Sequence, residues 1–290
     1  MAPQKSEAQN LLQKAEKKFN SSAGWFSSAS TKYEEAGDYF QQAANAFKLE
    51  RSFVDAGDAF AKEAECREKS GENNDAANAW WNAAKAYKQG DRPDLAIDAL
   101  GQTVTYLTKS GRFRQAADRE KDIAQIHLQR GDLARACQSY ERAGEWYQQE
   151  DANAMANGCF KDAADLHAQI DEFAQAIARY EQVADQSLQS NLTKYSVKEY
   201  WLRSGLCALA NMDSVTAKRN LDRYESLDPG FSTRLEGKFL RKLIEAVESA
   251  DVQAFSTACK DYDEVMKLDA WKTAILLKVK KTIDEEPGLT

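Results

Sequence analysis

A single amino acid recurs along this chain at a fixed spacing of twenty residues. Alanine occupies eight such positions, a run that chance composition does not produce: Ala36, Ala56, Ala76, Ala96, Ala116, Ala136, Ala156 and Ala176. Four residues further on stands a large, mainly apolar side chain in seven of the eight registers, and eight residues further on stands a small one, apart from Val104. Because positions i, i+4 and i+8 share one helical face, each unit predicts one helix with a small–large–small stripe.

Glycines mark the predicted turns between these helices. The turn signals are Gly37-Asp38, Gly57-Asp58, Gly71, Gly90-Asp91, Gly111 and Gly131-Asp132. Some of them, such as Gly37, fall inside the repeat pattern and are expected to be helical. Adjacent helices joined by short turns run antiparallel, so two units make a helical hairpin of 40 residues. No alternation of period two indicates a strand. The pattern therefore predicts an all-α, tetratricopeptide-like solenoid over residues 33–190, in which stacked hairpins bury one another's apolar faces.

The repeat ends near residue 190, where residues 186–191 are mostly polar and Ser196 takes the next alanine position. Asp228-Pro229-Gly230 is a firm helix breaker in the region that follows. Five further helices are predicted, at roughly 195–212, 214–227, 232–249, 251–267 and 269–284. Residues 191–290 are therefore expected to form a C-terminal helical bundle with an acidic tail, which caps the solenoid.

The stretch before the first repeat, residues 1–32, combines a helix with an aromatic loop. Apolar residues follow one helical face over residues 6–19, and residues 20–30 are mostly small apart from the adjacent Trp25 and Phe26. Two large aromatic side chains in a serine-rich loop require a surface into which they can insert. On the residues alone two interpretations stay open: contact with a membrane–water interface, or packing back onto the first hairpin.

Composition limits the possible partners and compartment. The chain has 39 Lys and Arg against 46 Asp and Glu, a net charge of −7, so binding to nucleic acid through overall charge is not expected. No apolar run approaches the roughly 20 residues that span a bilayer, and the amino terminus lacks an apolar signal segment, so a cytoplasmic protein is expected. The cysteines are expected to be buried thiols rather than disulfides or metal ligands: Cys66, Cys137, Cys159, Cys207 and Cys259.

The sequence offers little that could carry out catalysis. Its two histidines, His127 and His167, stand 40 residues apart in the same repeat register, which favours a structural role. The motifs of zinc proteases, serine hydrolases, phosphate-binding loops and dinucleotide-binding folds do not occur. We therefore expect no enzyme, no catalytic residue, no metal and no cofactor.

Several short motifs together resemble one family, the soluble NSF attachment proteins of the alpha type and their fungal counterparts. The resemblance extends essentially from end to end, and its last two motifs are not shared by ordinary tetratricopeptide proteins. It is carried by the Trp25-Phe26 loop, YEEA at 33–36, AANAFK at 43–48, GRF at 111–113, KYSVKEY at 194–200, and LDAW at 268–271 with KKTI at 280–283.

The resemblance implies an adaptor rather than a catalyst. Members of this family bind in several copies around a four-helix SNARE bundle and recruit the hexameric AAA ATPase NSF, which takes the bundle apart with ATP. A SNARE bundle is a long and largely acidic rod, so a chain of net charge −7 needs a basic stripe facing it. The resemblance also implies a cytoplasmic protein that is peripheral on membranes, with Trp25 and Phe26 as the membrane contact.

The resemblance also implies particular binding residues. Asp118 and Gly158 occupy two positions at which the family has lysines, and Arg119 stands nearby. The basic residues expected to bind SNAREs are Arg51, Arg112, Arg114, Lys161, Lys194, Lys198 and Arg203. The residues expected to bind NSF and stimulate its ATPase are Asp213, Glu245, Glu248 and the penultimate Leu289.

A second function is compatible with the repeat pattern alone. A generic tetratricopeptide-like scaffold would bind an extended peptide or a chaperone tail in its groove. A hydrolase or transferase with a solenoid shell is a more distant third. The ligand distinguishes the first two functions, because one binds a folded helical rod and the other an extended peptide.

Overall fold

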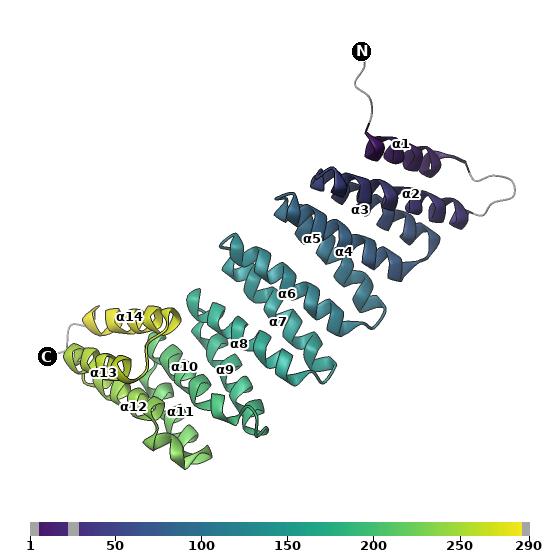
Figure 1. The fold of residues 1–290 in the computed structure, drawn as a ribbon. Coiled ribbons are helices and arrows are strands. Elements are labelled where there is room, and N and C mark those ends of the chain that lie inside the picture. Colours follow the sequence, from purple (N-terminus) through teal and green to yellow (C-terminus); the bar gives the residue numbers. More distant parts are fainter. Residues whose placement is uncertain (1–5, 23–28, 286–290) are drawn as a thin grey trace. The chain divides into compact units, whose positions relative to one another are not determined.

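The computed structural model describes residues 6–22 and 29–285, and the regular structure in these ranges is helical, without a strand (Figure 1). Residue contacts divide the chain into two compact units. The first is Met1–Arg130 with Glu145–Ala152, and the second is Gly131–Gly144 with Asn153–Thr290. The division falls inside helix α7 (Leu133–Gln149), whose two halves belong to different units. The all-α architecture confirms the predicted fold class.

In the first unit each helix packs on the next helix along the chain, and short turns make neighbours antiparallel (Figure 1). The first helix begins at a capping box, because Ser6 Oγ accepts a hydrogen bond from the Gln9 backbone N–H and the Gln9 side chain accepts one from the Ser6 N–H, both at 3.3 Å. The helices are α1 (Glu7–Asn20), α2 (Ala29–Leu49), α3 (Phe53–Ser70), α4 (Asn73–Gln89), α5 (Pro93–Lys109) and α6 (Phe113–Gln129).

The second unit contains the five predicted C-terminal helices. The predicted breaker at residues 228–230 lies between two of them, where Asp228 Oδ1 accepts the Gly230 N–H at 3.0 Å and a 3₁₀ turn, Pro229–Thr233, follows. A second 3₁₀ turn spans Lys194–Ser196. The helices are α8 (Asn153–Gln169), α9 (Phe173–Leu188), α10 (Val197–Ala210), α11 (Ser214–Leu227), α12 (Leu235–Glu248), α13 (Val252–Val265) and α14 (Ala270–Glu285).

Each twenty-residue repeat forms one helix, as predicted. Each of the eight alanines lies in a different helix from α2 to α9, and each is fully buried at 0% exposure. The register four residues later supplies the large core side chains, such as Phe40, Leu100 and Phe160. The small register permits close approach, because a Cβ on Gly144 of α7 would lie 2.5 Å from the Phe160 ring.

The turn predicted at Gly57-Asp58 is wrong, because both residues lie inside α3. A Cβ at Gly57 would lie 2.5 Å from the Tyr87 ring of α4, and the Tyr87 hydroxyl donates a hydrogen bond to Asp58 at 2.8 Å. This glycine therefore permits helix packing rather than a change of direction. Gly37 is helical as predicted, and the remaining glycine signals do lie between helices: Gly71, Gly90, Gly111 and Gly131.

Helix α10 is the centre of the second unit. It packs against α9, α11, α12 and α14, and eleven of its residues are buried. The Trp201 ring stacks on Tyr224 with centroids 4.9 Å apart, and Phe231 meets it edge-on. The hydrophobic core of this unit runs from Ala164 to Ile283, so it includes residues on both sides of residue 190, where the repeat pattern ends.

The cysteines are free thiols, as predicted, and all except the half-buried Cys259 are buried. Burial raises the pKa of the Cys259 thiol to about 11 and the pKa of the Cys66 thiol to about 12, so both stay protonated at neutral pH. Within the ranges that the structure describes, no helix is long and apolar enough to cross a membrane.

Candidate interaction surfaces

The basic residues predicted in the first unit lie at two separate places. Arg51 is exposed in the turn between α2 and α3, with φ at +60°. Arg112 precedes α6 and donates a hydrogen bond to Gln115 at 2.5 Å, and Arg114 is exposed in the first turn of the same helix. Because successive helices are antiparallel, the α2–α3 and α5–α6 turns lie at opposite helix ends. The structure therefore brings Arg112 and Arg114 together but not Arg51.

The two positions that lack an expected lysine have different surroundings. Asp118 accepts a hydrogen bond from the Tyr147 hydroxyl, so its carboxylate holds the second half of α7 against α6. Gly158 of α8 has open space around the position of a Cβ. Arg119, next to Asp118, forms an ion pair with Asp122 at 3.4 Å.

A group of residues that was not predicted lies on the same side of the first unit as Arg119. Trp81, Lys85 and Lys88 of α4 are exposed, and the cationic groups of Lys85 and Arg119 both lie over the Trp81 ring. Their spacing of i, i+4 and i+7 places them on one helical face and was visible in the sequence. The alanine repeat does not reveal these residues, because it marks the buried face of each helix.

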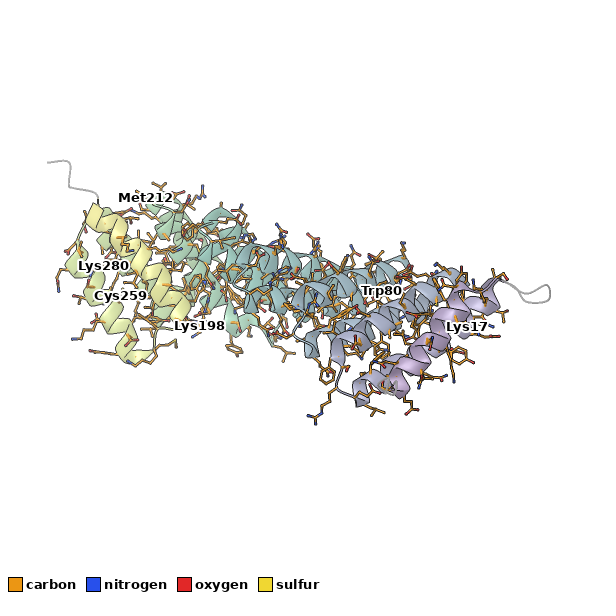
Figure 2. The ribbon with its side chains drawn as sticks, turned by 90° about the horizontal axis from the view of Figure 1, so that it is seen from above. Lys17, Trp80, Lys198, Met212, Cys259 and Lys280 are labelled. Carbon is orange, nitrogen blue, oxygen red and sulfur yellow. The ribbon has the colours of Figure 1, made fainter. Side chains whose placement is uncertain are left out.

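Three of the predicted basic residues in the second unit remain partly or fully exposed. Lys194 is exposed, and its ammonium donates to Asn191 at 3.0 Å. Lys198, labelled in Figure 2, pairs at 2.7 Å with Glu236, whose side chain is almost completely buried. Lys161 pairs with Asp165 at 2.7 Å. Burial opposes its charge, but the hydrogen bond and charge of Asp165 raise the pKa of Lys161.

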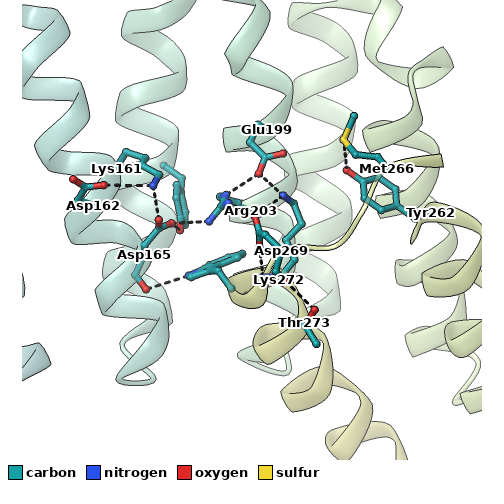
Figure 3. A network of polar contacts seen from close by, with 12 residues as sticks. Lys161, Asp162, Asp165, Glu199, Arg203, Tyr262, Met266, Asp269, Lys272 and Thr273 are labelled. Carbon is teal, nitrogen blue, oxygen red and sulfur yellow. Dashed lines mark hydrogen bonds and ion pairs between the residues drawn. The ribbon is translucent and has the colours of Figure 1, made fainter. Parts of the chain in front are cut away.

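Arg203 has a different environment, because only 7% of it is exposed and its guanidinium contacts three carboxylates (Figure 3). It reaches Asp165 of α8 at 2.8 Å, Glu199 of α10 at 2.8 Å and Asp269, just before α14, at 2.7 Å. Lys272 adds a second cation, 2.6 Å from Glu199. These contacts hold α8, α10 and the segment before α14 together and leave little of Arg203 open to a partner.

The predicted acidic residues lie on α11 and α12 of the second unit. Asp213 caps α11 by accepting the Thr216 backbone N–H at 2.8 Å, and this hydrogen bond lowers the pKa of Asp213. Glu245 is exposed and lines a hollow of about 480 Å³ between α12 and α13. Glu248, one helical turn further on, lies 3.5 Å from Lys218 of α11.

Three predicted site residues lie outside the described ranges: Trp25, Phe26 and Leu289. The two histidines lie inside them and have structural surroundings, as predicted. His127 is buried, and His167 bonds to Glu172 at 2.6 Å and to Glu141 at 3.2 Å. Hydrogen bonds to Cys137 and Glu141 raise the pKa of His167 to about 10, so it is a permanent cation at neutral pH rather than a catalytic base.

The fold and these surfaces define a helical-repeat protein of the tetratricopeptide-like class with exposed charges of both signs. The family description "Soluble NSF attachment protein, SNAP" matches residues 6–284. The chain therefore belongs to the soluble NSF attachment protein family. The family consists of attachment proteins rather than catalysts, which confirms the prediction that this chain is not an enzyme.

Individual relatives match along their whole length. The chain is 64% identical over 291 residues to the vesicular-fusion protein SEC17 of Coprinopsis cinerea, covering 100% of both chains. It is 37% identical to the alpha-soluble NSF attachment protein of Saccharomyces cerevisiae, covering 97% of this chain and 98% of the relative. Among solved structures, a putative kinesin light chain with TPR-like repeats from Podosopora anserina matches at 14% identity and a TM-score of 0.40, covering 68% of this chain and 96% of that one.

Proposed function

We propose that this chain is an adaptor in vesicular fusion. It binds assembled SNARE complexes and recruits and stimulates an NSF-type AAA ATPase, which takes the complexes apart with ATP. The observation that carries the proposal is the family match over residues 6–284, together with relatives named for vesicular fusion and for attachment of NSF. The exposed charges supply residues for both contacts.

The SNARE-binding surface of this proposal consists of basic residues. Arg51, Arg114 and Lys194 are exposed, Arg112 is partly exposed, and so are Lys161 and Lys198. Each of the last two is paired with a carboxylate of the chain itself, so a SNARE carboxylate must share that lysine or displace the internal partner. Charge complementarity to an acidic rod speeds association and selects partners, so binding is expected to weaken with added salt.

The ATPase-binding surface of the proposal is acidic and lies on α11 and α12. Glu245 and Glu248 stand one turn apart on the exposed side of α12, and Asp213 precedes α11. Exposed carboxylates of this kind suit basic patches on the ATPase. Leu289 is proposed to act with them in stimulating ATP hydrolysis.

Trp25 and Phe26 are proposed as the membrane contact of a cytoplasmic protein that is peripheral on membranes. Two aromatic side chains supply modest partitioning, so this contact gains strength when several copies share one complex. Replacing both with serine should reduce activity on liposome-bound SNAREs much more than on soluble SNARE complexes. Equal losses on both substrates would instead support packing of the two rings onto the first hairpin.

The proposal is tested by ATP-driven disassembly of a purified SNARE complex by NSF, followed on a gel with and without this protein. Disassembly that depends on the protein is the expected result. Circular dichroism checks that the protein is folded. If the folded protein has no effect on disassembly, the adaptor function is rejected, and an extended peptide becomes the next ligand to test.

A further inference from the structure

A hollow of about 670 Å³ opens between α1 and α3 in the first unit. Both helices pack on α2, and the buried side chains of Phe40, Ala59 and Tyr87 form the floor of the hollow. Leu12 and Phe19 of α1 are half-buried and line it from one side. The described lining residues include none of the basic residues proposed to bind SNAREs and none of the acidic residues proposed to bind the ATPase. The hollow is therefore separate from both proposed surfaces.

The rim of this hollow is acidic. Among its described lining residues, the exposed charged side chains are three carboxylates, Glu16, Asp55 and Asp58, and one cation, Lys62. The Lys62 ammonium is already paired with Glu65 at 2.9 Å. Within the described part of the chain, neither Glu16 nor Asp55 forms an ion pair.

The carboxylates of α3 also repel each other. Asp55 and Asp58 are three residues apart, so they lie on one face of the helix as a pair of like charges. A cationic group placed between them would replace this repulsion with attraction. The acidic rim therefore complements a positively charged partner, while the apolar floor complements an apolar side chain.

We propose that the hollow between α1 and α3 binds a cationic amphipathic helix of a further partner protein. Apolar side chains of such a helix enter the hollow, and lysines or arginines one turn away meet Glu16, Asp55 and Asp58. Two helices that flank an apolar groove are a surface on which a third helix can pack. An anionic membrane does not suit the hollow, because the carboxylates repel it. A small polycation would use the carboxylates and leave the apolar floor uncovered.

The test is binding of two labelled synthetic peptides to the full chain, measured by fluorescence anisotropy. The first peptide is an amphipathic helix with leucines at positions i and i+4 and lysines on both sides of them. The second peptide keeps every lysine and has alanine in place of each leucine. The leucine peptide should bind at least about tenfold more tightly, because its side chains cover the apolar floor. Added salt should weaken the binding of both peptides.

Variants of the chain locate the binding site. E16Q/D55N should weaken binding of the leucine peptide about fivefold, because two of the three carboxylates lose their charge. A61W should weaken it about tenfold, because the half-buried Ala61 lines the hollow and the indole ring would occupy it. The matched control for charge is E145Q/E150Q, which removes two exposed carboxylates away from the hollow. The matched control for position 61 is A61S, and both controls should bind like the wild type.

Melting temperatures show whether each variant is folded. E16Q/D55N changes only exposed side chains and keeps the test decisive if A61W is destabilised. Equal binding of the two peptides to the wild type would overturn the proposal and assign the carboxylates to a polycation. Equal weakening by E16Q/D55N and E145Q/E150Q would also overturn it, as would failure of the folded wild type to bind the leucine peptide.

SNARE disassembly by NSF separates this partner from the function proposed above. E16Q/D55N and A61W should support disassembly as the wild type does, because the hollow shares no described residue with the SNARE and ATPase surfaces. Loss of disassembly in the folded variants would overturn a separate partner and assign the hollow to one of those two contacts. Failure of the wild type to support disassembly would reject the adaptor function and leave the peptide result unaffected.

Discussion

At the scale of single residues, burial decides which charges are structural. Glu63 of α3 is 3% exposed, and only one of its carboxylate oxygens has a hydrogen-bond partner in the described part of the chain, the Gln41 side chain at 3.0 Å. The nearest cation, Arg67, is 3.9 Å away and also contacts Asp38 and Glu72. Burial therefore dominates over the attraction of Arg67 and raises the pKa of Glu63 to about 7.

This shift predicts how Glu63→Gln changes stability with pH. The ordinary pKa is 4.5, so between 4.5 and about 7 the folded state keeps a proton that the unfolded state releases. The stability of the wild type therefore falls as pH rises through that range, and the penalty is complete above it. The glutamine variant carries no such penalty and should be about 1–3 kcal/mol more stable at pH 8.

The measurement is thermal melting of the full chain at pH 5 and at pH 8. The variant should melt several degrees above the wild type at pH 8 and close to it at pH 5. Glu16→Gln on the exposed surface of α1 is the matched control and should show no pH-dependent difference. A Glu63→Gln effect of the same size at both pH values would contradict the predicted titration.

At the scale of helices, the sequence predicted the elements better than their partners. The alanine register identified each of α2 to α9, and the apolar positions with the breaker at residues 228–230 indicated α10 to α14. The pattern along one helix cannot show which distant helix it packs against, so the return of α14 to α8 was not predicted. Trp271 of α14 donates a hydrogen bond to the Asp165 carbonyl at 3.1 Å, across 106 residues. The carboxylates around Arg203 were not predicted for the same reason, because Asp165 lies on α8 and Asp269 just before α14.

Glycines of the repeat region are predicted to differ in their tolerance of substitution by alanine, because some lie against a neighbouring helix and others face open space. Gly144→Ala places a Cβ 2.5 Å from the Phe160 ring and should destabilise the chain by about 1–3 kcal/mol through overpacking between α7 and α8. Gly158→Ala of α8 meets no atom within 4 Å and should be neutral or stabilising by up to about 1 kcal/mol, because alanine favours the helix. Urea unfolding of both variants checks this difference. Similar free energies for the two would contradict close packing at Gly144.

The contacts of Arg203 at the junction of α8, α10 and α14 predict that Arg203→Met lowers the free energy of unfolding. Removing the guanidinium leaves Lys161 as the cation beside Asp165 and Lys272 as the cation beside Glu199 and Asp269. The loss of charged hydrogen bonds of this kind costs about 1.5–3 kcal/mol. A loss of that order in denaturant unfolding is expected, with SNARE binding retained at temperatures where the variant is folded. Unchanged stability combined with weaker SNARE binding would return Arg203 to the basic surface.

At the scale of the whole molecule, the family relation says more about the positions of binding residues than the composition does. A net charge of −7 excluded nucleic acid as a simple ligand but gave no position for a basic surface. The resemblance supplied individual positions, and the structure shows that these positions differ in exposure, from Arg51 in an open turn to the buried Arg203. The contacts of Lys85 and Arg119 with the Trp81 ring could not be predicted from a family pattern, because they depend on side chains of α4 meeting a side chain of α6.

The last prediction concerns coupling between the adaptor and its ATPase through Leu289. Leu289 is expected to lie outside the core, as residues near a chain terminus commonly do, so Leu289→Ala should leave the helical content and the melting temperature unchanged. It should still bind SNARE complexes as the wild type does but should stimulate ATP hydrolysis by NSF at least about tenfold less, a change of about 1.4 kcal/mol in activation free energy. Thr290→Ala is the matched control at the adjacent residue. Stimulation equal to that control would remove Leu289 from the proposed ATPase contact and leave the carboxylates of α11 and α12 to account for it.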